Sequence, residues 1–469
     1  MISKPTVLLF PWLGHGHISP FLELAKELNN SERFKVYICS TPANLVSVKK
    51  TLRNEGLSLS INVIELLLPE LPGLPSDLHS TNGLPVHLMP ILKQAFDMSS
   101  PKFMELLKNL SPELLIYDIL QPWAPAAASS LGIPSVVFIT TSAAASMYHF
   151  HLNAPKDDVV FPYGDTIYYH KHENVKVASS AKEKEEDIVT KCVASSSSIV
   201  LIKSFKEIEG KYADHLSLLT DKKIVPVGPL VADPYCPDTE QNTMIIKWLD
   251  TKAIGSTVFV SFGSEYFLSS ADLEEIAFGL EMSNVNFIWV LRFPKGGREI
   301  DISEALPLGF LERVKNRGLV VKGWAPQSKI LRHKNIGGFV SHCGWSSVLE
   351  AMKFGVAIVA MPMHLDQPIN ARLVAEVGVG LEVVREEGRL KRKNVAKVIQ
   401  QVVVSEQGVA VKAKAKAVKD IIEKNRNKEI GVAVGELHQL CKSAGVRGRL
   451  TLHRRTKSDG FTYRTFFLF

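Results

Sequence analysis

The sequence predicts an α/β protein with two doubly wound domains that face each other across a cleft. Short apolar runs alternate with helical patterns through both halves of the chain, which is typical of parallel sheets with helices on both faces. The chain has 469 residues, more than a single hydrophobic core usually serves. In a protein of this kind, a ligand is expected between the domains, at the carboxyl ends of the strands.

Each half contains apolar runs that we expect to be buried strands. In the first half these are Val7–Phe10, Lys35–Cys39, Leu114–Tyr117, Ser135–Ile139 and Ile199–Lys203. In the second half they are Thr257–Phe262, Asn286–Leu291, Gly318–Val321, Gly338–Ser341 and Ala357–Met361. Helical patterns lie between them, among them Pro20–Leu28, Pro101–Leu107, Ala271–Glu281 and Ser347–Phe354. Two sets of alternating strands and helices predict two separate sheets.

Residues 231–242 predict the joint between the two domains. They include two prolines and several polar residues and show no periodicity, a composition typical of linkers. The predicted domains are therefore residues 1–230 and residues 243–425.

The net charge of +7 does not indicate a nucleic-acid-binding protein. From Lys442 to the end, the chain carries seven lysines and arginines against one acidic residue, Asp459. The rest of the chain is therefore close to neutral, and the basic character belongs to the tail. Residues 443–469 show neither a helical nor a strand period, so we expect a disordered tail, with a peripheral membrane contact as the alternative.

Composition indicates a cytoplasmic globular protein. The five cysteines are scattered and form no C-x-x-C pair, which favours a reducing compartment and gives no zinc or disulfide pattern. The apolar run Val7–Phe10 is too short for a signal peptide. Residues 119–148 carry no charge, but prolines and glycine interrupt them, which favours a buried helix–strand–helix stretch over a transmembrane segment.

The strongest chemical signal spans Trp324–Gln367. Within it, a predicted strand ending at Ser341 leads through a turn into a helix, and Ser346 is a plausible N-cap of that helix. A helix N-terminus with free N–H groups binds anions, and phosphate is the commonest. Glu350 lies one turn further along the same face, where it could accept hydrogen bonds from ribose hydroxyls.

Other residues of this segment complete the pattern. Trp324 and Gln327 follow one predicted strand and could stack on and bond a base, while Asp366 and Gln367 follow another and could reach sugar hydroxyls. Each residue alone has an ordinary explanation, as a buried tryptophan, a capping serine or a surface acid. Together they match the parts of a nucleotide sugar in order.

A second pattern lies near the N-terminus, where the glycine-rich segment 14–20 contains His15 and His17. A histidine at such a turn suits proton transfer near neutral pH, although both could be ordinary loop residues. Asp118, at the end of a predicted strand in the same half, could orient a catalytic histidine or cap the next segment. A dinucleotide-binding fingerprint is disfavoured, because Ser19 stands where its third glycine would be.

These segments resemble the plant UDP-dependent glycosyltransferases, which have the two-domain GT-B fold. The resemblance rests on Trp324–Gln367, Gly16–Pro20 and Val260–Ser264 and covers nearly all of residues 5–441. It implies that UDP-glucose is the donor substrate, with no cofactor and no metal. The UDP-sugar-binding residues that it implies are Ser264, Trp324, Ala325, Gln327, His342, Trp345, Ser346, Ser347, Glu350, Asp366 and Gln367.

The resemblance also assigns roles. Trp324 and Gln327 would contact uracil, Glu350 the ribose, and Asp366 and Gln367 the transferred sugar, with a terminal glutamine usual for glucose. The diphosphate would lie against Ser264, His342, Ser346 and Ser347. His17 would be the general base and Asp118 its partner in an inverting displacement.

The sequence departs from the family pattern in two places. Ser346 stands where an asparagine is frequent, which exchanges an amide donor for a hydroxyl, and Ala357 stands where a proline is common. Residues 426–442 would form a last helix that returns to the N-terminal domain.

The acceptor is the least determined part of the prediction. The chain looks similar to the branch that adds glucose to a sugar already on a plant metabolite, with glucosylation of the free aglycone as the alternative and an inactive UDP-sugar-binding protein as a remote one. The N-terminal domain would bind this small-molecule acceptor through segments Leu68–Leu88 and Thr140–His151. We expect a monomer, with no nucleic-acid partner and no transmembrane segment.

Overall fold

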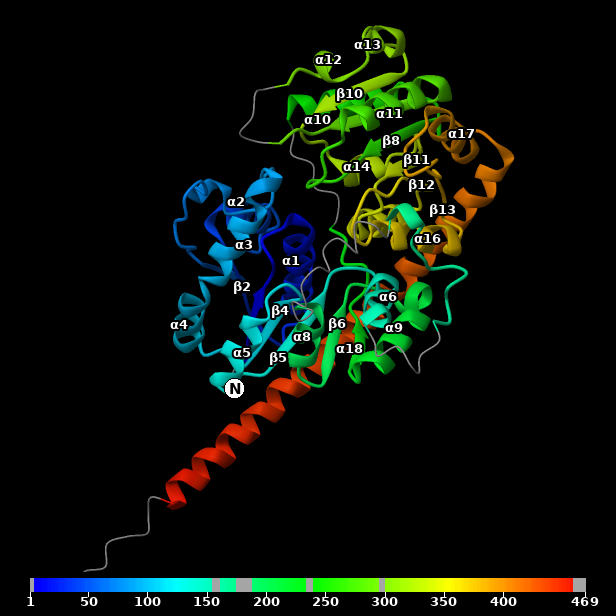
Figure 1. Cartoon of the computed structure of the whole chain (residues 1–469). Coiled ribbons are helices and arrows are strands. Elements are labelled where there is room, and N and C mark those ends of the chain that lie inside the picture. Colours follow the sequence, from blue (N-terminus) through cyan, green and yellow to red (C-terminus); the bar gives the residue numbers. More distant parts are fainter. Residues whose placement is uncertain (1–3, 154–160, 174–187, 233–238, 295–299, 459–469) are drawn as a thin grey trace, which may run out of the picture.

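The computed structural model describes residues 4–153, 161–173, 188–232, 239–294 and 300–458. Two parallel sheets organise these residues into two domains stacked one above the other (Figure 1). The chain is therefore the two-domain α/β protein that the sequence predicts.

The N-terminal sheet has seven parallel strands in the order β3-β2-β1-β4-β5-β6-β7. Its strands are β1 (Thr6–Phe10), β2 (Lys35–Ser40), β3 (Ile61–Glu65), β4 (Leu114–Asp118), β5 (Ser135–Ile139), β6 (Ile199–Ile202) and β7 (Lys223–Pro226). Its helices are α1 (His15–Asn30), α2 (Pro42–Asn54), α3 (Met89–Asp97), α4 (Ser100–Leu110), α5 (Trp123–Ser130), α6 (Ala143–Asn153), α8 (Ile188–Ser195) and α9 (Lys206–Thr220). Strands β1, β4 and β5 are almost wholly buried, as expected of strands covered on both faces.

The C-terminal sheet has six parallel strands in the order β10-β9-β8-β11-β12-β13. Its strands are β8 (Thr257–Ser261), β9 (Asn286–Leu291), β10 (Gly318–Lys322), β11 (Ile336–Ser341), β12 (Ile358–Ala360) and β13 (Gly380–Glu382). The helices after the domain joint are α10 (Glu240–Asp250), α11 (Ser270–Ser283), α12 (Ile302–Ala305), α13 (Phe310–Val314), α14 (Gln327–Leu331), α15 (Trp345–Phe354), α16 (Gln367–Val377), α17 (Arg392–Val403) and α18 (Glu406–Ser458).

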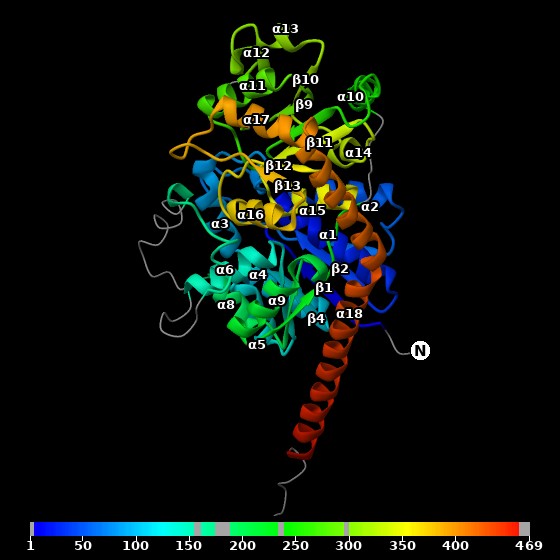
Figure 2. The same cartoon turned by 90° about the vertical axis from the view of Figure 1, so that its right-hand side faces the viewer.

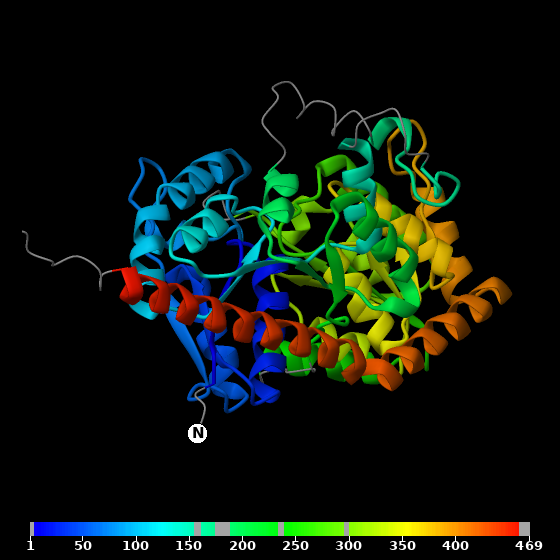
Figure 3. The same ribbon diagram turned by 90° about the horizontal axis from the view of Figure 1, so that it is seen from below.

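Helix α18 packs against both domains. Its residues Ala415, Val418 and Ile422 belong to a large core cluster that includes residues of α15 and of C-terminal strands as well as N-terminal residues. Further along, Ile430, Ala433, Val434, Leu437 and Cys441 complete a core made of N-terminal strands and helices. Seen from below, the helix runs beneath the molecule from one domain to the other (Figure 3).

The structure differs from the expectation at the C-terminus. The predicted helix 426–442 is part of the longer α18, which continues to Ser458. Residues 443–458 are therefore helical rather than irregular, and they extend away from the body of the molecule (Figure 2). The segment contains no proline, so nothing in it forces the preceding helix to end. Residues 459–469 lie outside the described residues.

Helix α10 begins inside the predicted linker, at Glu240. Of the predicted linker 231–242, residues 233–238 lie outside the described residues, and Thr239 caps α10 through a bond from the Asn242 N–H of 3.2 Å. Residues 119–148 hold α5, β5 and the first part of α6, which confirms the buried helix–strand–helix interpretation. Among the described residues, none of the helices combines the length and apolarity that a bilayer crossing requires.

Candidate functional site

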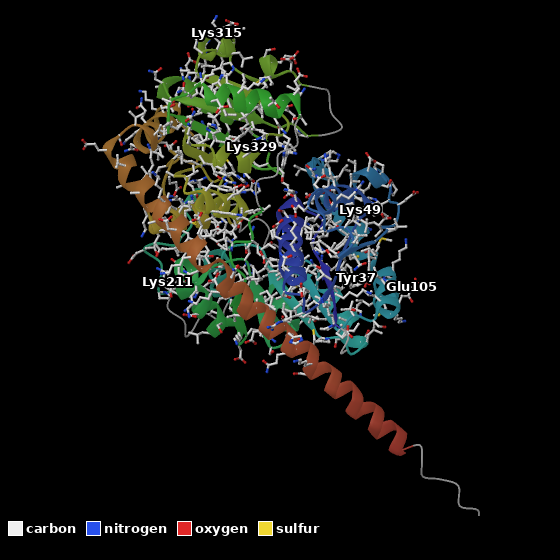
Figure 4. All side chains as sticks on the ribbon, turned by 180° about the vertical axis from the view of Figure 1, so that it is seen from behind. Tyr37, Lys49, Glu105, Lys211, Lys315 and Lys329 are labelled. Carbon is white, nitrogen blue, oxygen red and sulfur yellow. The ribbon has the colours of Figure 1, made fainter. Side chains whose placement is uncertain are left out.

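The loops that follow the carboxyl ends of both sheets meet at the boundary between the domains. Thr81 donates to Glu265 Oε1 at 2.6 Å, Arg292 donates to Asn82 Oδ1 at 3.0 Å, and Ser142 donates to Asn370 Oδ1 at 2.6 Å. In the view from behind, Lys211 lies in the lower domain (Figure 4), and it pairs with Glu376 of α16. These bonds fix the two domains against each other.

His17 lies in the first turn of α1, directly after β1. The sequence predicted a turn here, but the helix begins at His15 because Gly14 is extended and its carbonyl accepts the N–H groups of His17 and Ile18 at 3.0 and 2.9 Å. The side chain of His17 remains 21% exposed, so one edge of the ring is open to a ligand.

Asp118 is the last residue of β4, beside β1, and is fully buried. Its Oδ2 lies 2.8 Å from His17 Nδ1, and Thr140 Oγ1 lies 3.3 Å from the same nitrogen. A carboxylate can only accept, so Nδ1 carries the proton and Nε2 is left free to accept another. Burial lowers the pKa of His17, but the charge of Asp118 and its hydrogen bond outweigh burial and raise the pKa above its ordinary value.

Asp366 approaches this pair from the other domain. It is the residue before α16, and its Oδ2 accepts a 2.9 Å bond from Asn370 Nδ2. Burial raises its pKa, while the charge of His17 acts across the domain boundary to lower it. Gln367 holds the same loop, because its Oε1 accepts the backbone N–H groups of Met363 and His364 at 3.0 and 3.1 Å.

The turn between β11 and α15 has the form of an anion site. Gly344 is the N-cap, so Ser346 is the second helical residue rather than the cap that the sequence predicted. Cys343 before it has a φ of 65°, a left-handed conformation that is uncommon outside glycine. The Ser347 and Val348 N–H groups bond to Gly344 O, which leaves the N–H groups of Trp345 and Ser346 as the free donors of the first turn.

His342, in this turn, packs between Gly344 of the same turn and Gly263 of the loop after β8. A Cβ at Gly263 or at Gly344 would come within 2.6 Å of His342 Nε2, so the ring packs directly on both backbones. Burial lowers its pKa to about 3. The ring is therefore neutral at ordinary pH and can act on a phosphate only as a hydrogen-bond donor. Ser264 follows Gly263 and lies in the loop after β8.

Glu350 and its neighbours form a second cluster on α15. The carboxylate accepts bonds from Gln327 Nε2 and Ser328 Oγ, both at the start of α14, and burial raises its pKa. Trp324 precedes this cluster and is 58% exposed, with the His15 ring edge-on at 5.9 Å and Arg292 above it at 5.6 Å. An exposed tryptophan in such a place offers a free aromatic face.

Two predicted residues point into the protein. Ala325 and Trp345 are both nearly fully buried, and Trp345 Nε1 donates to the backbone oxygen of Lys203 at 2.6 Å. Their side chains therefore pack the site from behind. Through its backbone N–H, Trp345 still belongs to the turn before α15.

The sequence analysis did not identify Lys203, which follows β6 and is 2% exposed. Its Nζ donates to Ser346 Oγ at 2.8 Å across the domain boundary. A signal was present, since a lysine at the carboxyl end of an otherwise apolar strand lies at the sheet edge where ligands bind.

Within the described residues, no group of three or more histidine, cysteine or acidic side chains is arranged to hold a metal ion. A cavity of about 520 Å³ opens beside the loop before α16 and is lined by residues of both domains, including Tyr169, Glu173, Tyr266, His364 and Arg385.

Comparison with known proteins finds similar chains over almost the whole length. Residues 4–232 match the family "Glycosyltransferase, N-terminal domain", and residues 167–425 match the family "UDP-glucoronosyl and UDP-glucosyl transferase". The chain is 50% identical over 443 residues to UDP-glucosyltransferase 29 of Panax ginseng, covering 94% of this chain and 98% of that protein. It is 47% identical over 440 residues to beta-D-glucosyl crocetin beta-1,6-glucosyltransferase of Gardenia jasminoides, covering 92% and 98%.

Solved structures are similar in fold. UGT2 of Phytolacca americana, complexed with UDP-2-fluoro-glucose and pterostilbene, is 26% identical with a TM-score of 0.76, over 94% of this chain and 99% of that one. UGT71G1 of Medicago truncatula, complexed with UDP-glucose, is 25% identical with a TM-score of 0.75, over 93% and 98%.

Proposed function

The chain belongs to the plant UDP-dependent glycosyltransferases, and from this premise we propose that it transfers glucose from UDP-glucose, with inversion, to a hydroxyl of a plant secondary metabolite. The acceptor hydroxyl belongs to a sugar of an existing glycoside, so the product carries a β-glucosyl branch. His17 is the general base. No metal or resident cofactor takes part, and the enzyme works in the cytosol.

The observation that carries the proposal is the bonded pair of His17 and Asp118, with Asp366 facing it from the other domain. The N-terminal domain supplies the base and the carboxylate that orients it, and the C-terminal domain supplies a polar residue for the donor sugar. This is the arrangement that an acceptor on one side and a sugar nucleotide on the other require.

The reaction follows from these positions. His17 Nε2 takes the proton of the acceptor hydroxyl as its oxygen attacks the anomeric carbon, and Asp118 stabilises the imidazolium that forms. The bond from the anomeric carbon to the UDP oxygen breaks at the same time, with inversion. The electron pair stays on UDP, where the N-terminus of α15 and the neutral His342 stabilise the added charge.

Support for glucose and for a glycoside acceptor comes from the relatives. Two proteins at 50% and 47% identity are named as glucosyltransferases, and the second is named for a glucosylated acceptor. Relatives at 43% and 41% are named for glucuronosyl and rhamnosyl transfer onto flavonoid glucosides. The acceptor class is thus common to several relatives, while the donor sugar varies among them, so the donor requires a direct test.

The test is UDP release with EDTA present, using UDP-glucose, UDP-glucuronic acid and UDP-rhamnose with paired aglycones and their monoglucosides. The expected result is turnover with UDP-glucose and monoglucosides. Turnover on aglycones alone would overturn the acceptor assignment and leave the reaction class intact. Release only with another donor would overturn glucose, and an activity abolished by EDTA would contradict the metal-free mechanism.

His17→Ala is the variant for the base. It should retain UDP binding, because the UDP-sugar-binding residues that the sequence predicts lie in the other domain, while kcat falls on the order of 10²–10⁴-fold. Comparable turnover in this variant would remove His17 from the mechanism.

A further inference from the structure

Lys203 reaches the anion site from the opposite domain. It follows β6 of the N-terminal sheet, is 2% exposed, and donates from Nζ to Ser346 Oγ at 2.8 Å. Its backbone oxygen accepts the Trp345 indole N–H at 2.6 Å. Two successive residues of α15 thus hold both ends of the lysine, so its ammonium has a fixed place.

The direction of the Lys203–Ser346 bond has a chemical consequence. An ammonium has three donors and no lone pair, so Ser346 Oγ is the acceptor and keeps its own hydrogen free to donate. Among the described residues, the bond from Lys203 is the hydrogen bond that the structure gives this hydroxyl. The bond to an ammonium also makes the hydroxyl a stronger donor, since successive hydrogen bonds polarise one another.

The anion site contains no cation of its own. Segment 341–350, which forms the turn and the first half of α15, has no lysine and no arginine, and His342 is neutral because burial lowers its pKa to about 3. A diphosphate carries two or more negative charges. Free N–H groups and a helix dipole supply only partial charges, so a full positive charge must come from elsewhere.

We infer that Lys203 is the cation of the diphosphate site and that it binds the diphosphate of UDP together with the Ser346 hydroxyl. The inference rests on the proposed function, and it adds a binding residue contributed by the acceptor-side domain. Diphosphate binding then bridges the two domains directly. The serine that replaces the family's frequent asparagine acts together with the lysine.

The surroundings of Lys203 agree with this role. Burial lowers its pKa to about 8, while the charges of Glu350 on α15 and Glu23 on α1 act to raise it. The third titratable neighbour is His15, whose own pKa the lysine helps to lower. Lys203 is therefore charged at neutral pH, and a bound diphosphate would hold the proton more firmly.

The test compares binding of UDP and of uridine by titration calorimetry in the full-length protein. Lys203→Met removes the charge and keeps the stem, and Lys203→Arg keeps the charge. Lys353→Met is the matched control, since this lysine lies at the other end of α15 and donates to Val231 O at 2.7 Å. We expect Lys203→Met to weaken UDP binding at least about tenfold and to leave uridine binding within about twofold, while the arginine variant and the control bind UDP nearly as well as the wild type.

Failure of the role of Lys203 and failure of the proposed function give different results in this titration. If the wild type binds no UDP, the proposed function itself fails. If it binds UDP and Lys203→Met binds UDP equally well, or loses UDP and uridine alike while its melting temperature is unchanged, the inference is wrong and the function stands.

A measurement on the wild type alone covers the case in which the methionine variant does not fold. UDP affinity should fall as pH rises from 7 to 8.5 through the titration of Lys203, while uridine affinity should not, because the uracil N–H keeps its proton over this range. Parallel pH profiles for the two ligands would overturn the inference.

Discussion

At the scale of single residues, His17 and His342 show how the surroundings of a histidine determine whether it exchanges a proton near neutral pH. Burial lowers the pKa of both rings. For His17, the buried Asp118 carboxylate overcomes that effect and raises the pKa. His342 has glycine backbone on both sides, so its pKa falls to about 3. One histidine can exchange a proton near neutral pH, and the other remains a neutral donor.

The pH profile of Asp118→Asn tests this account. In the wild type, kcat/KM should rise with pH as His17 loses its proton and should level off above its raised pKa. The variant removes the charge that raises this pKa, so the rising limb should move at least about one unit to lower pH and the plateau should fall on the order of 10- to 100-fold.

Glu265→Gln is the control for this profile, because Glu265 also raises the pKa of His17 but makes no hydrogen bond to it. In Glu265→Gln, the rising limb of the kcat/KM profile should also move to lower pH, but by less than in Asp118→Asn. An unchanged limb in Asp118→Asn would show that Asp118 does not set the proton affinity of the base.

How far the site could be predicted also depends on the residue. His17 and Asp118 could be paired before the structure through the family resemblance and the position of Asp118 at the end of an apolar strand. They lie together because β1 and β4 are neighbours in the sheet. Lys203 could not be paired with Ser346, since a contact between two domains depends on their mutual orientation. The bonds from Gln327 and Ser328 to Glu350 depend on how α14 packs against α15, which spacing does not reveal.

At the scale of elements, glycines decide how closely the β11–α15 turn packs. Gly344 has φ −56° and ψ 134°, a conformation that alanine adopts without strain. Its hydrogen is nevertheless required, because a Cβ would lie 2.6 Å from His342 Nε2. The position of His342 in the donor site therefore requires a residue without a Cβ at position 344.

Gly344→Ala should displace the His342 ring and with it the free N–H groups of the helix. We expect the KM for UDP-glucose to rise about tenfold or more and the stability to fall by about 1–3 kcal/mol. Gly431→Ala is the control, since its added Cβ meets nothing within 4 Å on α18 and should stabilise the helix by about 0.5–1 kcal/mol. A wild-type KM in Gly344→Ala would show that the ring does not touch the donor.

Most of the strands that could be predicted are almost wholly buried, and β10, a half-buried edge strand, is the exception. The ten expected strands are present because each is a continuous apolar run. The sequence analysis did not identify β3, β7 and β13, whose residues INVIE, KIVP and GLE are only partly buried. Such edge strands are set by pairing with a neighbour, which local composition does not record.

At the scale of the whole molecule, α18 is the element on which both domains depend. Truncation after Asn427 would remove the five α18 residues that complete the N-terminal core. Three of them, Ile430, Val434 and Leu437, contribute about 1.5–3 kcal/mol each, so the loss is comparable with the total stability of a domain. This variant should be insoluble or should lack a cooperative thermal transition.

Truncation after Ser443 should leave the melting temperature and UDP release unchanged, because Cys441 is the last residue of α18 in the core among those whose side chains the structure describes. The melting of both truncated proteins is measured by circular dichroism, and UDP release is measured for the protein that ends at Ser443. A loss of turnover in the longer variant would assign a function to the tail.

The same helix has a consequence for biosynthesis. The N-terminal core is synthesised first, yet the residues that close it are added only after the entire C-terminal domain has been translated. At ordinary elongation rates this interval is on the order of 10–40 s, during which an apolar surface of the nascent chain stays uncovered. The first domain to leave the ribosome is therefore the last to be completed, and the nascent chain should need a chaperone for as long as that surface is open.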